Sequence, residues 1–237
     1  MALYTLADLH LSTDVDKPMD IFGGAWRGYQ DKLRDNLASV LHEEDTLVIP
    51  GDLSWGINLR EALGDFRFLT ALPGRKILIK GNHDLWWETV SKMERFFAEH
   101  EIENIFFLHN NYQPYESPEG RIALCGTRGW FFDEEKGDAH DDKMRNREIL
   151  RLEASLKAAK SAGETCIYCF MHYPPLYPGY ECAPILSLLE SYGVERCYYG
   201  HLHGESCRFA YQGVKNGVNY QLVSSDSVRF QPILVAP

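Results

Sequence analysis

Short runs of apolar residues recur along the chain, and most of them end at a glycine, a proline or a polar side chain. Runs of about four to six β-branched, aromatic and aliphatic residues are typical of buried strands. The pattern predicts strands at 3–7, 46–50, 76–80, 121–125, 166–171 and 196–199. Each strand would deliver polar residues at its C-terminal end, which is where sites of α/β folds lie.

Between these runs, hydrophobic residues recur at the spacing of amphipathic helices. The spacing predicts helices at 29–42, 58–72, 84–99, 141–162 and 183–192. Strand–helix alternation through about residue 200 indicates an α/β fold. The last segment differs, because 206–212 and 218–224 both have strand character and the stretch 213–217 between them contains two glycines. That arrangement predicts an antiparallel hairpin.

A chain of 237 residues fits a single domain spanning 1–237, without a linker or an internal repeat. The least regular segment is 131–140, for which a solvated loop is favoured over a lid. The sequence contains no run of about 18 apolar residues, so no membrane span is predicted. The first eight residues lack the basic region of a signal peptide, so a cytoplasmic location is expected.

Charge and cysteine usage narrow the function further. The formal net charge of −10 argues against nucleic acid as a partner, because such binding depends on Lys and Arg. Most of the six cysteines lie in apolar, strand-like stretches and are expected to be reduced, buried thiols. Cys166 and Cys169 have the spacing of half a zinc site, but no second pair follows, so a structural zinc is the less favoured alternative.

Side chains that bind divalent metals follow five of the predicted strands. The stretches are Asp8-Leu9-His10, Gly51-Asp52, Gly81-Asn82-His83-Asp84, Met171-His172 and Gly200-His201-Leu202-His203. Asp, Asn and His together suit Mn, Fe or Zn. Two such ions about 3.5–4 Å apart can clamp the attacking and leaving oxygens of a phosphoryl displacement. The sequence therefore predicts a two-metal phosphoester hydrolase.

Local geometry supports this interpretation. Alternate residues of an extended segment point the same way, so Asp8 and His10 can face one ion, as can His201 and His203 if their loop bends. The glycine before Asp52 allows a tight turn and close approach to a metal. A carboxylate has two oxygens, so Asp52 can bridge two ions.

As a series of five motifs in this order, these stretches resemble those of the calcineurin-like metallophosphoesterase superfamily, and in particular its small bacterial-type phosphohydrolase and phosphodiesterase branch. The matching stretches run from Asp8 to His203 and so cover most of the chain. The resemblance implies a four-layer αββα sandwich, in which two mixed β-sheets pack face to face with helices on both outer sides.

The resemblance also implies roles for single residues. One ion would be bound by Asp8, His10, Asp52 and His203. The other ion would be bound by Asp52, Asn82, His172 and His201. A hydroxide bridging the two ions would attack phosphorus. His83 would protonate the leaving group or stabilise the charge of the transition state.

At two positions the chain differs from the protein Ser/Thr phosphatases of this superfamily, and these differences indicate which branch it resembles. Protein Ser/Thr phosphatases of the superfamily carry an acid three residues after the bridging Asp, followed by an Arg, where this chain has Trp55 and Gly56. The acid that would orient His83 is therefore missing from its usual place. Asp84 is a favoured N-cap residue type, so capping of the 84–99 helix is its expected role, with orientation of His83 as the alternative.

The Gly-His-Leu-His and His-Tyr-Pro-Pro stretches favour a phosphodiester, small phosphorylated metabolite or nucleotide as the substrate. A protein Ser/Thr phosphatase, a nuclease and a catalytically silent protein-binding scaffold of the same fold are the alternatives. The oligomeric state stays open.

Substrate-side candidates are fewer. Arg128, Arg145 and Arg147 could meet phosphate oxygens bidentately, although a surface salt bridge is favoured for the last two. Five tryptophans lie near the motifs and could stack on a base or line a pocket, with core packing expected for Trp86 and Trp87. They are Trp26, Trp55, Trp86, Trp87 and Trp130.

Overall fold

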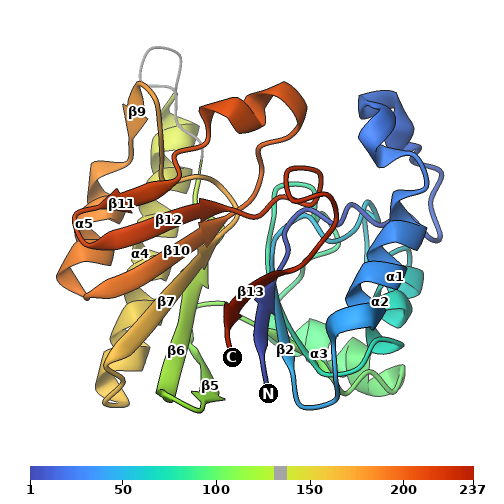
Figure 1. The fold of residues 1–237 in the computed structure, drawn as a ribbon, viewed down its shortest axis with the longest axis horizontal. Helices are drawn as coiled ribbons and strands as arrows, with labels where there is room; N and C mark the ends of the chain where they lie inside the picture. Colours follow the sequence, from blue (N-terminus) through green and yellow to red (C-terminus); the bar gives the residue numbers. More distant parts are fainter. Residues whose placement is uncertain (131–137) are drawn as a thin grey trace.

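The computed structural model describes residues 1–130 and 138–237 of the chain. Two mixed β-sheets lie face to face, and helices cover the outer side of each sheet (Figure 1). This is the four-layer αββα sandwich that the resemblance implies, so the predicted fold class is confirmed.

The first sheet has the strand order β13-β1-β2-β3-β4, and only β13 runs antiparallel to its neighbour. Its strands are β1 (Leu3–Thr5), β2 (Thr46–Pro50), β3 (Arg75–Ile79), β4 (Ile105–Phe107) and β13 (Ile233–Ala236). The helices on its outer side are α1 (Tyr29–Val40), α2 (Leu63–Thr70) and α3 (Val90–Glu99).

The second sheet has the order β11-β12-β10-β7-β6-β5, with antiparallel pairing at both edges and parallel pairing between. Its strands are β5 (Gln113–Ser117), β6 (Gly120–Thr127), β7 (Cys166–Met171), β10 (Val194–Tyr199), β11 (Gly213–Lys215) and β12 (Val218–Leu222). Its outer side carries α4 (Ala139–Ser161) and α5 (Ala183–Ser191). The short elements are β8 (Leu176–Tyr177), β9 (Tyr180–Glu181) and the 3₁₀ helices η1 (Met19–Phe22), η2 (Gly24–Trp26) and η3 (Gly204–Phe209).

Apolar side chains fill three layers of core. One cluster lies between the first sheet and its helices, and another lies between the second sheet and α4 and α5. The third lies between the two sheets and includes Val48, Ile77, Leu124 and Phe170. Strands that are buried on both faces explain why the sequence shows unbroken apolar runs and no alternation.

All six predicted strands are present, but two helices begin later than predicted. The segment 58–62 forms a turn, in which the Asn58 carboxamide oxygen accepts the backbone N–H groups of Arg60 (3.0 Å) and Glu61 (3.1 Å). Helix α3 begins at Val90, and its N-cap is Thr89. The predicted capping role of Asp84 is therefore wrong, because the helix starts six residues further on.

The C-terminal hairpin exists, but its first strand is β11 and not 206–212. Asn216 and Gly217 have positive φ angles of 50° and 81°, as a two-residue type I′ turn requires, so the strand directly precedes them. The Ser206 hydroxyl is bonded to both the N–H (2.9 Å) and the C=O (2.6 Å) of His203. These bonds hold the segment in the 3₁₀ turn η3.

Several other expectations have mixed outcomes. Most of the predicted loop or lid at 131–140 lies outside the described residues, and Asp138 is the N-cap of α4.

All six cysteines are free thiols, and no group with metal-ligand geometry in the described chain includes one. Among the described helices, none has the length and apolar character needed to cross a membrane. The single domain and the cytoplasmic location stay predictions.

Candidate metal centre

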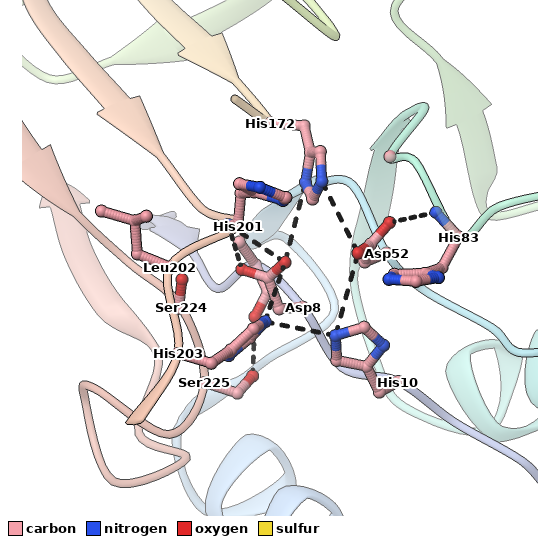
Figure 2. A network of polar contacts seen from close by, with 12 residues as sticks. Asp8, His10, Asp52, His83, His172, His201, Leu202, His203, Ser224 and Ser225 are labelled. Atoms are coloured by element: carbon pink, nitrogen blue, oxygen red, sulfur yellow. Dashed lines mark hydrogen bonds and ion pairs between the residues drawn. The ribbon is translucent and has the colours of Figure 1, made fainter. Parts of the chain in front are cut away.

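The chain brings the predicted metal-binding residues to one place, beyond the C-terminal ends of five parallel strands in the two sheets. Figure 2 shows all of them except Asn82 as labelled side chains. Asp8 and His10 follow β1, Asp52 follows β2, and Asn82 follows β3. His172 follows β7, and the loop carrying His201 and His203 follows β10. The sheets face each other, so residues up to 195 positions apart in sequence meet at this edge.

A first group of donor atoms gathers around the His203 imidazole. Its Nε2 lies 3.3 Å from Nε2 of His10 and 3.6 Å from Oδ1 of Asp8. Nε2 of His10 lies 3.8 Å from Oδ2 of Asp52. Two ring nitrogens and two carboxylates therefore converge from three different loops.

A second group gathers around the Asn82 carboxamide oxygen. It lies 2.6 Å from Nε2 of His172 and 3.0 Å from Nδ1 of His201. Nε2 of His172 is also 3.5 Å from Oδ2 of Asp52. The same oxygen of Asp52 thus approaches both groups, while its other oxygen accepts the backbone N–H of His83 at 2.8 Å.

These donors fit divalent ions on three grounds. Ligands bound at about 2.0–2.2 Å around one ion lie roughly 3–3.5 Å from each other, which is close to the distances above. No Lys or Arg in the described chain forms an ion pair with Asp8 or Asp52, although both carboxylates are buried. Burying two carboxylates together costs free energy that cations would offset. The role of each residue as a ligand stays a prediction.

Three of the four imidazoles are in the protonation state that binds metals. Burial lowers the pKa of His172 to about 3 and that of His201 to about 4, and it puts the pKa of His10 well below 6.5. These three rings are therefore neutral at pH 7, which is the form that binds metals. His203 differs, because the carboxylates of Asp8 and Asp226 outweigh its burial and raise its pKa to about 10.

The two carboxylates also differ in protonation. Burial, together with the charges of Asp84 and Asp8, raises the pKa of Asp52 well above its usual value. Burial acts in the same direction on Asp8, but the neighbouring His203 outweighs it and keeps the pKa of Asp8 below the usual value. A cation placed between them would favour the ionised form of both.

The backbone is strained at four of the predicted ligands. Asp8, His10, Asp52 and His201 have φ angles of 60°, 47°, 53° and 72°. Such angles are uncommon for residues with a Cβ atom and are found at functional sites when the surroundings enforce them. The side chains of these four residues point toward one another (Figure 2).

Glycines beside the ligands permit the close approach of loops. A Cβ atom on Gly81 would collide with the Asp52 carboxylate, and one on Gly200 would collide with the Asp8 carboxylate. The glycines in the Gly-Asn-His and Gly-His-Leu-His stretches thus leave room for a carboxylate that follows another strand.

The Asp84 carboxylate links the loop of Asp52 to the loop of Asn82. Its buried carboxylate accepts backbone N–H groups of Gly81 (2.7 Å), Asp52 (2.9 Å), Leu53 (2.9 Å) and Ser54 (3.2 Å). It also accepts the indole N–H of Trp86 at 3.0 Å. The residue holds the Asp52 loop against the Asn82 loop.

Sequence reasoning missed Asp226, which orients His203. Its Oδ1 lies 2.8 Å from Nδ1 of His203, and its Oδ2 accepts the N–H of Gly204 at 2.8 Å. Asp226 lies just beyond β12, so it follows an apolar run as the other site residues do. Its position after an apolar run is a sequence signal for Asp226, whereas the strand pattern by itself predicts only the hairpin.

We expect Asp226→Asn to weaken metal binding by about 10–100-fold, because outer-shell partners of ligating histidines fix the tautomer and the ring direction. Titration of the chelator-stripped protein with Mn²⁺ measures the effect. The matched control is Asp35→Asn, on the exposed side of α1. Equal affinities for the two variants would contradict the role of Asp226.

The predicted substrate-side arginines have different surroundings. Arg128 is largely buried, with Nη2 3.7 Å from Glu148 and its guanidinium 4.6 Å from the Trp130 ring. Arg147 is half exposed beside Glu148, and Arg145 forms an ion pair with Asp142 at 2.8 Å. The expected surface pairing thus exists for Arg145 and Arg147, and a substrate role for the three stays a prediction.

Four of the five tryptophans are buried or contact the site. Trp86 and Trp87 are in the core, as predicted. Trp26 is also buried and meets the rings of His10 and His203 edge-on at 5.7 and 5.6 Å. Trp55 contacts His10 and His83.

The sequence model of one protein family, described as calcineurin-like phosphoesterase, matches residues 1–205. The chain belongs to this family. The match spans every predicted metal-binding residue, and Asp226 lies beyond it. No curated protein is significantly similar to the chain in sequence.

Two solved structures have a similar fold and match nearly the whole of this chain. Phosphopantetheinyl hydrolase from Mycobacterium tuberculosis has a TM-score of 0.62 and 15% identity, over 100% of this chain and 96% of that one. A protein of unknown function from Aquifex aeolicus has a TM-score of 0.51 and 20% identity, over 98% and 95% of the two chains. At these identities the likeness supports the fold alone.

Proposed function

We propose that the chain is a dinuclear metal-dependent phosphoester hydrolase that acts on a phosphodiester or a small phosphorylated metabolite or nucleotide. The observation that carries this proposal is the pair of donor groups that share Oδ2 of Asp52. Asp8, His10 and His203 would complete one position, and Asn82, His172 and His201 the other.

Two divalent ions held there would supply Lewis acidity and a nucleophile formed from water at neutral pH. The protein itself contributes negative charge, donor atoms and the positioning of the loops. Asp52 and Asp8 supply the negative charge that holds cations, and the three neutral imidazoles add donors without adding charge. Hydrogen bonds that the carboxylates of Asp84 and Asp226 accept keep the loops in position, so little reorganisation accompanies the reaction.

His83 is the candidate general acid. Its backbone N–H is bonded to Asp52, and its ring lies 5.6 Å from that of His10, next to the first donor group. An imidazole there can donate a proton to a departing oxygen or stabilise its charge. Burial lowers the pKa of His83 below 6.5.

We expect His83→Asn to lower kcat about 10²–10⁴-fold for an ester with a poor leaving group, because general acid catalysis is worth that much. Diphenyl phosphate is such an ester, whereas bis(p-nitrophenyl) phosphate needs less help from an acid. The matched control is His100→Asn, at the end of α3. Full turnover of diphenyl phosphate by His83→Asn would contradict the role.

Two features favour a small substrate over a phosphoprotein. The place of the acid and arginine of protein phosphatases is taken by Trp55 and Gly56. The net charge of −10 disfavours a nucleic-acid track. A silent scaffold would not need to keep every donor and His83, so the complete set favours an enzyme.

The direct test uses chelator-stripped protein with and without Mn²⁺. Hydrolysis of bis(p-nitrophenyl) phosphate is compared with that of p-nitrophenyl phosphate. Metal-dependent cleavage with a preference for the diester is the expected result. A preference for the monoester would favour the phosphatase alternative, and no turnover by folded, metal-loaded protein would contradict the proposal.

A further inference from the structure

Within residues 1–130 and 138–237, the His83 imidazole has no polar partner that fixes its direction. Among the residues that the structure describes, no hydrogen bond or ion pair involves its ring, and only its backbone N–H is bonded, to Asp52. Two other histidines of the site do have such a partner: Nδ1 of His203 lies beside Asp226, and Nδ1 of His172 lies 3.2 Å from the carbonyl oxygen of Pro50. A partly exposed ring without such a bond is free to leave a productive rotamer.

Trp55 provides the closest ring contact of His83. The two ring centroids are 4.3 Å apart at an interplanar angle of 50°. The indole of Trp55 also stacks on His10, at 5.0 Å and 22°. It therefore touches both the candidate acid and a candidate metal ligand, and Nδ1 of His10 is itself buried without a hydrogen-bond partner.

Trp55 is in turn held from three directions. Its backbone N–H donates to the carbonyl of Leu11 at 2.9 Å, and its indole N–H meets the sulfur of Met19 at 3.2 Å. The ammonium of Lys17 lies 4.6 Å from the ring centroid. These contacts come from the loop that follows β1, so the indole is anchored independently of His83.

We propose that Trp55 is the positioning residue for His83, and that aromatic packing does here what a hydrogen-bonded carboxylate would otherwise do. Aromatic rings attract each other in defined arrangements, so contact with the Trp55 indole would select one rotamer of the His83 ring. Displacement of a catalytic group by about 1 Å can cost as much as 10²-fold in rate. The inference rests on the proposed function, because His83 needs positioning only if an ester is cleaved.

The proposal makes a prediction that a merely structural role does not. If Trp55 acts by positioning the general acid, its removal should lower kcat for esters whose leaving group needs a proton. It should change kcat little for esters whose leaving group does not. We expect Trp55→Leu to lower kcat on diphenyl phosphate by about 10–100-fold. On bis(p-nitrophenyl) phosphate the loss is expected to stay below about threefold. Trp55→Phe keeps an aromatic face and should restore most of the turnover of diphenyl phosphate.

A double-mutant cycle sharpens the test. Once His83 is replaced by Asn, removal of Trp55 should have no further effect on diphenyl phosphate, because residues that act as a unit are not additive. Bound Mn²⁺ is measured for each variant, since Trp55 also stacks on His10. Unchanged metal content separates the effect on His83 from a disturbance of the metal centre.

Different results would overturn the role of Trp55 and the proposed function. Equal losses of kcat on both esters, additive effects in the cycle, or a loss that follows bound Mn²⁺ would overturn the role of Trp55 and leave the proposed function intact. Absence of metal-dependent cleavage by the unsubstituted chain would overturn the proposed function and this inference with it.

Discussion

Replacing Asp52 with Asn is expected to remove at least one of two bound Mn²⁺ ions and to lower kcat/KM by about 10³-fold or more, equivalent to ~4 kcal/mol of transition-state stabilisation. Oδ2 of Asp52 is the atom that approaches both donor groups, at 3.8 Å from His10 and 3.5 Å from His172. An amide is neutral and presents only one oxygen. If that oxygen keeps the bond from His83 N–H, the NH₂ group faces the metals.

The measurement is metal content after reconstitution, together with the rate on bis(p-nitrophenyl) phosphate. Asp35→Asn, on the exposed side of α1, makes the same chemical change away from the site and should leave both values unchanged. Retention of two ions and of the full rate by Asp52→Asn would contradict a shared ligand at this position.

Asp84→Ala should destabilise the folded chain by about 4 kcal/mol and abolish tight metal binding. The substitution leaves four backbone N–H groups and the Trp86 indole N–H without their acceptor. A buried donor left unpaired costs about 1–3 kcal/mol. Because the loops of Asp52 and Asn82 lose their common anchor, the second donor group would also lose its geometry.

Urea-induced unfolding of the metal-free protein measures this effect without any contribution from bound ions. Asp35→Ala serves as the control, because an exposed helix residue should change the free energy of unfolding by less than about 0.5 kcal/mol. A loss below about 1 kcal/mol for Asp84→Ala would show that the N–H groups find other acceptors, and the anchoring role would be wrong.

The fold and the place of the site follow from local features of the sequence. Apolar runs such as 46–50 and 166–171 coincide with β2 and β7, because parallel strands buried on both faces tolerate few polar residues. The polar residues at their ends meet because the sheets face each other with the C-terminal ends of those strands together. The gathering of Asp8, Asp52 and His172 was therefore predictable.

The supporting interactions were harder to predict, because they are long-range. The local sequence around Asp84 predicts a helix cap. Its hydrogen-bond partners Asp52 and Leu53 are 32 and 31 positions away in sequence. Asp226 contacts His203 across 23 positions. The positive φ angle of Asp8 has no local sequence signal, because the surrounding loops enforce it.

The most direct test of a dinuclear centre is anomalous diffraction from a crystal of the protein loaded with Mn²⁺. We predict two manganese peaks about 3.5–4 Å apart, both within bonding distance of Asp52. One peak should have His10 and His203 as ligands, and the other should have Asn82, His172 and His201. A single peak, or two peaks with no shared carboxylate, would contradict the assignment of this site.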